Sequence, residues 1–324
     1  MKKIRRMVVS MGLIALQAGC NDAQNALEDQ LIKAEASKFS VGVLLPDIGL
    51  GDQSFNDLAV SGLVNARDDL DILWSYREAT TNDIIESQFQ ALIDEGHDLI
   101  MGVGYTSQEA LEKLAQEYPE QQFVIVDSAS DIENIDGLMF KEDEGSYLAG
   151  IVAAKTSKTG VLGFVGGFED PIILKFLDGF ERGAKSVNPD AQVLVEYANS
   201  YSDDKLGASI ASNMIANQAD VLYAAAGYTG VGLLHEAQRK SVYAIGVDID
   251  QYYYAEKAVI TSMTKNVDVA VYDYVKNYLE NKPTSQQNLE FGIAEDGVDL
   301  APIRVVDNAI QLEQDVEKAK ADLK

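Results

Sequence analysis

Short apolar runs alternate along the chain with segments of mixed polarity, beginning at Phe39 and continuing nearly to the C-terminus. The runs are rich in β-branched residues and nearly free of charge, as in strands that a parallel sheet buries on both faces. They form two series of five, which are residues 39–46, 70–76, 97–104, 122–128 and 135–140, and then 159–167, 191–198, 219–227, 242–248 and 259–264. We predict a β-strand at each run.

The segments between these runs have the pattern of amphipathic helices. In residues 107–118, for example, Leu111 and Leu114 fall on one face, and residues 203–217 begin with acidic residues, which a helix dipole favours there. Strands and helices therefore alternate at a spacing of roughly 25–35 residues, the size of a βαβ unit. This order predicts an α/β fold with parallel sheets, and the two series predict two similar lobes.

The end of the chain adds elements beyond the second series. The pattern predicts a helix over residues 266–281 and a last strand over residues 303–307, "IRVVD". Because these elements follow a complete second lobe, we expect the chain to pass back between the lobes before it ends.

The N-terminus has the pattern of a secretory leader over residues 1–19, with a basic start followed by a short apolar stretch. Cys20 is the single cysteine of the chain and follows two small residues. A leader that ends in this way resembles the bacterial lipobox, although Gln17 departs from the usual aliphatic residue. The alternative is an ordinary leader with a chance cysteine. We expect a lipid anchor on Cys20 and a polar tether over residues 20–37.

The composition is that of a globular protein, with 47% apolar and 24% charged residues among 324. The formal net charge of −26 repels phosphate backbones, which argues against nucleic-acid binding, and we attribute the acidity to solubility. A single cysteine offers neither an internal disulfide nor a thiolate metal site.

Functional residues are expected beyond the carboxyl ends of the predicted strands, where open α/β sheets bind their ligands. The loop after the first strand, "DIGLGDQSFND" over residues 47–57, carries acids, glycines and one aromatic side chain. The other strand ends carry further acids, amides, aromatics and one lysine, namely Tyr105, Thr106, Asp127, Gly166, Gly167, Asn199, Tyr201, Gly227, Tyr228, Thr229, Asp248, Asp250 and Lys265.

These positions do not have the pattern of an enzyme or of a phosphate site. His97 opens a strand at the opposite end, His235 lies on a helix, and the sequence has no Gly-x-Ser-x-Gly elbow. The glycine-rich stretches 102–107 and 227–232 lack the third glycine of a dinucleotide site or the Lys-Ser/Thr ending of a Walker loop. We expect no cofactor and no metal.

Binding of a small neutral polar molecule remains. Phe55 and Tyr201 follow strands of different lobes, so their rings could stack on a flat ligand from both sides. The alternative is that Phe55 caps the core of its own lobe, but Ser54, Asn56 and the aspartates around it favour a binding role. A DNA-binding regulator with similar lobes would need a helix-turn-helix, and this chain has a leader in that place.

Several stretches, taken in order, resemble the basic membrane protein family of bacterial ABC-transporter substrate-binding lipoproteins, in its purine nucleoside receptor branch. They are "DIGLGDQSFND", "FVIVDS", "KEDEGSYLAGIVAAKTSKTGVLGFVGG", "GFERGAKSVNP", "DVLYAAAGYTGVG", "AIGVDIDQ" and "TSMTKNVDVAVYD". The resemblance implies a type I periplasmic binding protein, with two Rossmann-like lobes joined by a three-stranded hinge. We expect an N-terminal lobe of residues 38–141 and 266–300 and a C-terminal lobe of residues 142–265 and 301–324.

The resemblance also implies that the cleft between the lobes holds a purine nucleoside. Phe55 would stack on one face of the base, and Tyr201, where the family usually has phenylalanine, would stack on the other. Asp127 would accept hydrogen bonds from the edge of the base. The ribose hydroxyls would be surrounded by Asp47, Asn56, Gly227, Asp248 and Lys265, and Ser54 completes the expected ligand-binding set.

The chemistry of an ionised carboxylate indicates which purine bases Asp127 should prefer. Such a group only accepts hydrogen bonds, so Asp127 favours the N1–H of guanine or hypoxanthine over the bare N1 of adenine. A cleft with several acids should also exclude nucleotides, because it repels their phosphates.

The expected function is therefore that of a membrane-anchored receptor in the bacterial cell envelope, facing the periplasm or the cell exterior. It would deliver guanosine, inosine or adenosine to an ABC permease. One alternative is a receptor of the same fold for another small molecule or for a signalling role. A second and less favoured alternative is a nucleoside-processing enzyme.

Overall fold

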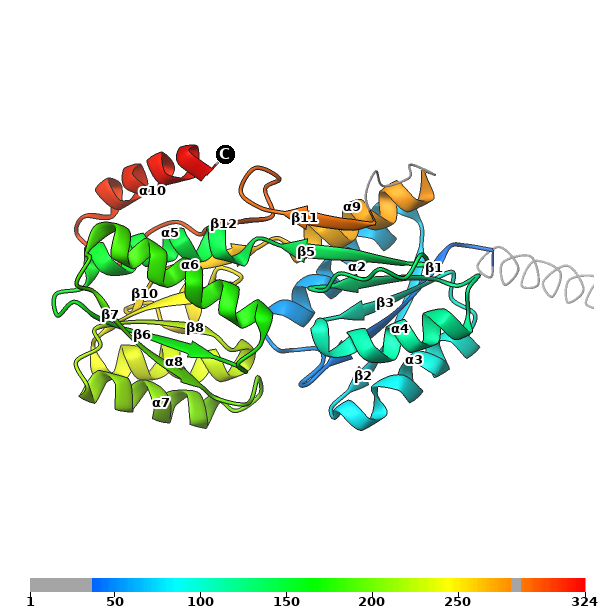
Figure 1. Ribbon diagram of the computed structural model, residues 1–324, viewed down its shortest axis with the longest axis horizontal. Helices are drawn as coiled ribbons and strands as arrows, with labels where there is room; N and C mark the ends of the chain where they lie inside the picture. The colour runs from blue at the N-terminus through cyan, green and yellow to red at the C-terminus, as the bar shows by residue number, and fades with distance from the viewer. Residues whose placement is uncertain (1–36, 281–286, 324) are drawn as a thin grey trace, which may run out of the picture.

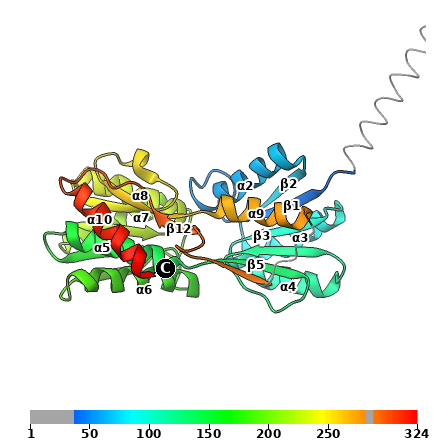
Figure 2. The same ribbon diagram turned by 90° about the horizontal axis from the view of Figure 1, so that it is seen from above.

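The computed structural model describes residues 37–280 and 287–323, which form two lobes that lie side by side (Figures 1 and 2). The first sheet has the order β11 (Asn288–Phe291), β5 (Ile135–Phe140), β4 (Gln122–Val126), β3 (Leu99–Val103), β1 (Ser40–Pro46) and β2 (Leu73–Ala79). The second has the order β12 (Val298–Leu300), β10 (Val259–Lys265), β9 (Tyr243–Asp248), β8 (Val221–Ala225), β6 (Val161–Gly166) and β7 (Gln192–Tyr197). Among these strands only the pair β10–β12 is antiparallel. The predicted α/β class with parallel sheets in two lobes is confirmed.

Helices cover both faces of each sheet, because each buried strand needs apolar cover on two sides. In the first lobe these are α2 (Phe55–Leu70) and α9 (Val267–Leu279) on one face, and α3 (Ile85–Asp94) and α4 (Gln108–Glu117) on the other. In the second lobe they are α5 (Glu142–Thr156) and α6 (Pro171–Val187) on one face, and α7 (Asp204–Ala216) and α8 (Gly227–Lys240) on the other. Short 3-10 turns lie at Asn82–Ile84, Tyr105–Ser107 and Gln251–Tyr254.

The last helix, α10 (Ala309–Leu323), lies over α5 of the second lobe (Figure 2). Two ion pairs hold it there, because Lys155 Nζ is 2.9 Å from Asp315 Oδ2 and Lys320 Nζ is 2.5 Å from Asp299 Oδ1. Leu312 and Val316 bury its apolar side.

Two predicted elements near the C-terminus differ from the structure. The last strand expected over residues 303–307 is absent, although Arg304 still donates its backbone N–H to the carbonyl of Ile260 at 2.7 Å. Pro302 has no N–H for a ladder, and Val305 has φ 59°, which ends an extended run. Residues 298–300, which the sequence assigned to the N-terminal lobe, form β12 and pair with the second sheet.

One strand also begins later than predicted. The run over residues 70–76 contributes Leu70 to α2, and Asp71 ends that helix in the left-handed conformation at φ 55°. Strand β2 therefore begins at Leu73. The expected leader, Cys20 and nearly all of the expected tether lie outside the described residues.

The chain passes between the sheets three times, after β5, after β10 and between β11 and β12 (Figure 1). This agrees with the three-stranded hinge that the resemblance implied. The rings of Phe140 and Phe291 lie 5.4 Å apart beside two of these crossings. An apolar core runs through them from one lobe into the other, and its members there include Met263, Ile293 and Val298.

Candidate functional site

A cavity lies between the lobes at the carboxyl ends of the parallel strands, which is the place that this architecture predicts. Of the expected ligand-binding residues, those that line it are Asp47, Phe55, Asn56, Asp127, Tyr201, Gly227, Asp248 and Lys265. Residues from both lobes that are far apart along the chain thus meet in one cavity. Their role in ligand binding remains a prediction.

Three aspartates of the cavity have an unusual backbone conformation. Asp47 follows β1 with φ 56°, Asp127 follows β4 with φ 66°, and Asp248 ends β9 with φ 65°. The left-handed region is uncommon for residues other than glycine, and aspartate tolerates it better than most. Such strain collects at functional sites, where the surrounding fold maintains it. Burial raises the pKa of each of these carboxyl groups.

The loop over residues 47–57 is held by its own acids. Asp52 accepts hydrogen bonds from the backbone N–H of Ser54 at 3.0 Å and of Asn56 at 2.8 Å, and Asp57 accepts one from Gly51 at 2.7 Å. With the N–H of Asp57 at 3.2 Å, Asp52 binds two N–H groups in the first turn of α2, as a capping residue does. It is also buried and lines the cavity, and burial raises its pKa to about 6 although these N–H groups lower it.

Asn56 is fixed by the same loop and keeps one oxygen free. Its side-chain amide donates to the carbonyls of Pro46 and Gly49, each at 3.1 Å. Both N–H groups of the amide are then used, and the buried Oδ1 accepts no hydrogen bond from the described residues. Asn56 is therefore a positioned hydrogen-bond acceptor in the wall of the cavity.

Ser54 was expected in the ligand-binding set, but it does not line the cavity. It is fully buried, and its hydroxyl donates to Asp248 Oδ2 in the opposite lobe. This bond joins the loop before α2 to the end of β9. Ser54 thus contacts a predicted ligand-binding residue of the other lobe.

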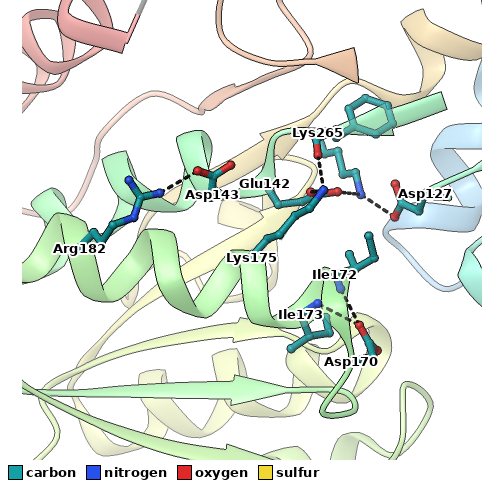
Figure 3. Close-up of polar contacts among 10 residues, drawn as sticks. Asp127, Glu142, Asp143, Asp170, Ile172, Ile173, Lys175, Arg182 and Lys265 are labelled. Atoms are coloured by element: carbon teal, nitrogen blue, oxygen red, sulfur yellow. Dashed lines mark hydrogen bonds and ion pairs between the residues drawn. The ribbon is translucent and has the colours of Figure 1, made fainter. Parts of the chain in front are cut away.

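Lys265 ends β10, and its ammonium lies between two buried carboxylates (Figure 3). Its Nζ is 2.6 Å from Asp127 Oδ2 and 2.9 Å from Glu142 Oε1. The same atom lies 5.0 Å from the centre of the Phe55 ring, within the range of a cation–π contact. Burial alone would lower the pKa of Lys265, but Asp127 and Glu142 outweigh it and raise the pKa, so the lysine is charged.

Asp127 has one oxygen in use and one free. Lys265 occupies Oδ2, whereas the buried Oδ1 has no hydrogen-bond partner in the described part of the chain. Burial raises the pKa of Asp127 to about 7, Lys265 opposes this rise, and Glu142 adds to it. Leaving a buried acceptor unpaired costs about 1–3 kcal/mol, so Oδ1 is a strong candidate for contact with a ligand.

Tyr201 keeps its hydroxyl satisfied within its own lobe. The hydroxyl donates to Asp170 Oδ2 at 3.2 Å, and Asp170 Oδ1 accepts the first N–H groups of α6 from Ile172 and Ile173, each at 3.0 Å (Figure 3). The ring packs over Gly167, where an added Cβ would lie 2.0 Å from it. A residue larger than glycine there would displace the ring.

Sequence reasoning missed two contributions to the site and listed a third residue without assigning it a role. Glu142 follows strand β5 by two residues, and the same search of strand ends would have found it. The apolar wall of Ile172, Ile173 and Phe176 gave no such signal, because these residues have the ordinary spacing of a buried helix face. Thr106 stood at a strand end, and its buried Oγ1 has no partner among the described residues.

The sequence matches a known protein family over nearly all of its described residues. Residues 38–324 match the family described as "ABC transporter substrate-binding protein PnrA-like". The chain belongs to this family. It is therefore a substrate-binding protein of an ABC transporter and not an enzyme.

Relatives of known name span almost the whole chain. It is 32% identical over 317 residues to the "CD4+ T-cell-stimulating antigen" of Listeria monocytogenes, covering 91% of this chain and 88% of that protein. It is 30% identical over 338 residues to the "ABC transporter nucleoside-binding protein BmpA" of Lactococcus lactis subsp. cremoris, covering 97% and 94%. A crystal structure of an ABC transporter solute-binding protein from Aeropyrum pernix K1 matches with a TM-score of 0.80 at 28% identity, covering 88% and 91%.

Within residues 37–280 and 287–323, no helix has both the length and the apolar character needed to cross a bilayer.

Proposed function

We propose that this substrate-binding protein captures purine nucleosides between its lobes and delivers them to the permease of its transporter. The observation that carries the proposal is the combination of Phe55 from one lobe, Tyr201 from the other and the free, buried Oδ1 of Asp127 in one cavity. Two rings suit a flat base, and the carboxylate oxygen suits an N–H on its edge. The relative from Lactococcus lactis that is named as nucleoside-binding supports the same ligand class.

The acidic wall supports a nucleoside over a nucleotide. Asp47, Asp127 and Asp248 line the cavity, and Lys265 is already paired with two carboxylates. A phosphate in this cavity would meet carboxylates at short range and would lose its water. Ribose hydroxyls both donate and accept hydrogen bonds, so these aspartates and Asn56 are suitable partners for them.

Calorimetry with guanosine, inosine, adenosine and GMP tests the proposal. We expect guanosine and inosine to bind more tightly than adenosine at pH values above 7, where Asp127 is ionised, and GMP to bind poorly. Because the family is not enzymatic, incubation with inosine should release no free base. The proposal is wrong if no nucleoside gives heat or a thermal shift, or if GMP binds as tightly as guanosine.

We further propose that residues 1–19 are removed and that Cys20 carries a lipid, which anchors the protein in the cell envelope with its cleft outside the cytoplasm. The order of a basic stretch, an apolar stretch, small residues and a single cysteine supports this. A labelled fatty acid fed to the cells should be recovered on the wild-type protein and be absent from Cys20→Ala. Equal labelling of both proteins would contradict the anchor.

A further inference from the structure

Glu142 is a fully buried carboxylate that does not line the cavity and yet is linked to it. Its Oε1 lies 2.9 Å from Lys265 Nζ, and its Oε2 lies 3.3 Å from Lys175 Nζ on α6 (Figure 3). Lys265 in turn holds Asp127 at 2.6 Å. A carboxylate outside the cavity thus shares its cation with the carboxylate inside it.

This arrangement joins two crossings of the hinge to one side of the cavity. Glu142 begins α5 directly after the first crossing, and Lys265 lies at the second. Asp127 follows β4 in the first lobe. The charged groups that face Asp127 are Lys265 from β10, Glu142 from α5 and Asp248 from β9.

The charges of this cluster compete for one proton. Lys265 favours the ionised form of Asp127, whereas burial, Glu142 and Asp248 favour the protonated form. Because Oδ2 is bound to Lys265, a proton on Asp127 would reside on the free Oδ1. The free oxygen would then change from a hydrogen-bond acceptor into a donor.

We propose that Glu142 is a positioning residue that, through the shared Lys265 ammonium, sets whether Asp127 carries a proton and therefore which base edge the cavity accepts. An ionised Asp127 accepts the N1–H of a 6-oxopurine, and a protonated Asp127 donates to the bare N1 of adenine. The choice of base as the ligand rests on the proposed function above. The control of Asp127 by Glu142 rests on the buried cluster alone.

The sign of the effect follows from the charges. The pKa of Asp127 is raised to about 7, so the preference for inosine over adenosine should be largest above this pH and should fall below it. Glu142→Gln removes one negative charge near Asp127 and lowers its pKa, which moves the fall in preference to lower pH. Lys175→Met removes a positive charge that pairs with Glu142, so the fall in inosine preference should move to higher pH.

The test is the ratio of the two dissociation constants, for adenosine and inosine, measured by calorimetry between about pH 5 and about pH 8. Wild-type protein should lose about tenfold to a hundredfold of its inosine preference on acidification, the worth of one charge-assisted hydrogen bond. In Glu142→Gln the midpoint of this loss should lie about one pH unit lower. A ratio of two similar ligands cancels any general weakening of the fold.

Asp143→Asn is the matched control. Asp143 is the next residue of α5 and also pairs with a cation, Arg182 at 2.7 Å, but it is 37% exposed and points away from the cavity (Figure 3). This variant should keep the wild-type midpoint. The inference is overturned if Glu142→Gln has the wild-type midpoint, or if Asp143→Asn shifts it equally.

A second measurement keeps the inference separate from the choice of ligand. The side-chain carboxyl carbon of Asp127 can be titrated by NMR in protein without added nucleoside and assigned by its loss in Asp127→Asn. The midpoint of this Asp127 titration should fall in Glu142→Gln and rise in Lys175→Met. The Lys175 side chain is partly exposed, so the fold should tolerate its substitution. If no nucleoside binds, the proposed function and the choice of base fail, whereas an unmoved Asp127 midpoint in Glu142→Gln overturns the role of Glu142.

Discussion

The two lobes line the same cavity with different chemistry. In the first lobe, Asn56, Thr106 and Asp127 each present a buried polar atom that finds no partner within the described residues. The second lobe faces them largely with apolar groups, namely Ile172, Ile173, Phe176, Ala225, Ala226 and Val247. The hydroxyl of Tyr201 and the carboxylate of Asp248, which also belong to the second lobe, already have partners.

The difference indicates that the two lobes have different roles in binding, hydrogen-bond recognition in the first and exclusion of water in the second. A ligand has to match the free acceptors and donors of the first lobe, so this lobe determines which hydrogen-bonding pattern is accepted. An apolar wall has no such preference, but it removes water and strengthens the polar contacts opposite it. Lys265 belongs to both sides, because it ends a strand of the second sheet and binds Asp127 of the first lobe.

The largest effect should come from breaking the bridge between the two sides. Lys265→Met leaves Asp127 and Glu142 buried without their cation, and losing one member of such a pair costs roughly 3–5 kcal/mol in the free energy of unfolding. Denaturation with urea measures this loss. The deficit should be greatest at high pH, because protonation of Asp127, whose pKa burial already raises to about 7, removes its repulsion with Glu142 at lower pH.

An exposed ion pair provides the control for this variant. Lys113 and Glu86 lie 2.6 Å apart with both side chains more than half exposed, so Lys113→Met should leave the unfolding free energy nearly unchanged. Equal stabilities for Lys265→Met and the wild-type protein would show that the bridge does not hold the lobes.

A smaller effect should follow from removing the free acceptor of the first lobe. Asp127→Ala should weaken inosine binding by roughly 1.5–3 kcal/mol, the value of one hydrogen bond to a charged group. Calorimetry with inosine and adenosine measures it, and adenosine should lose less. Unchanged inosine affinity would show that Asp127 does not contact the ligand. It would also contradict the assignment of hydrogen-bond recognition to the first lobe.

The smallest effect should come from the polar group of the second lobe. Tyr201→Phe keeps the ring and removes the hydroxyl that contacts Asp170 and Tyr105, so inosine binding should weaken by no more than about 0.5–1.5 kcal/mol. The same calorimetric titration measures it. A loss larger than that of Asp127→Ala would reverse the assignment of recognition to the first lobe.

The sequence predicted the strands well because a parallel sheet imposes nearly continuous apolar runs. It failed at residues 303–307, where three of the five residues are apolar but Pro302 and the positive φ of Val305 prevent a regular ladder. Periodicity records how a segment is buried, and it does not record whether its backbone groups can pair.

The same limit applies to the site. The rule of strand ends identified Asp127 and Lys265 separately, but it could not show that residues 138 positions apart form one ion pair. It also could not show that Tyr201 would find its hydroxyl partner in Asp170, at the start of a helix. Both pairs depend on tertiary packing, across the lobes for Lys265 and Asp127 and within the second lobe for Tyr201 and Asp170, and no local pattern encodes it.

The threefold passage of the chain between the sheets has a consequence for how the protein is made. The first lobe obtains α9 and β11 only after every strand of the second sheet except β12 has been synthesised. Neither sheet can be completed on the ribosome until almost the whole chain has emerged, and contacts over such distances slow folding. No single cut in the chain would release either lobe as an intact fragment.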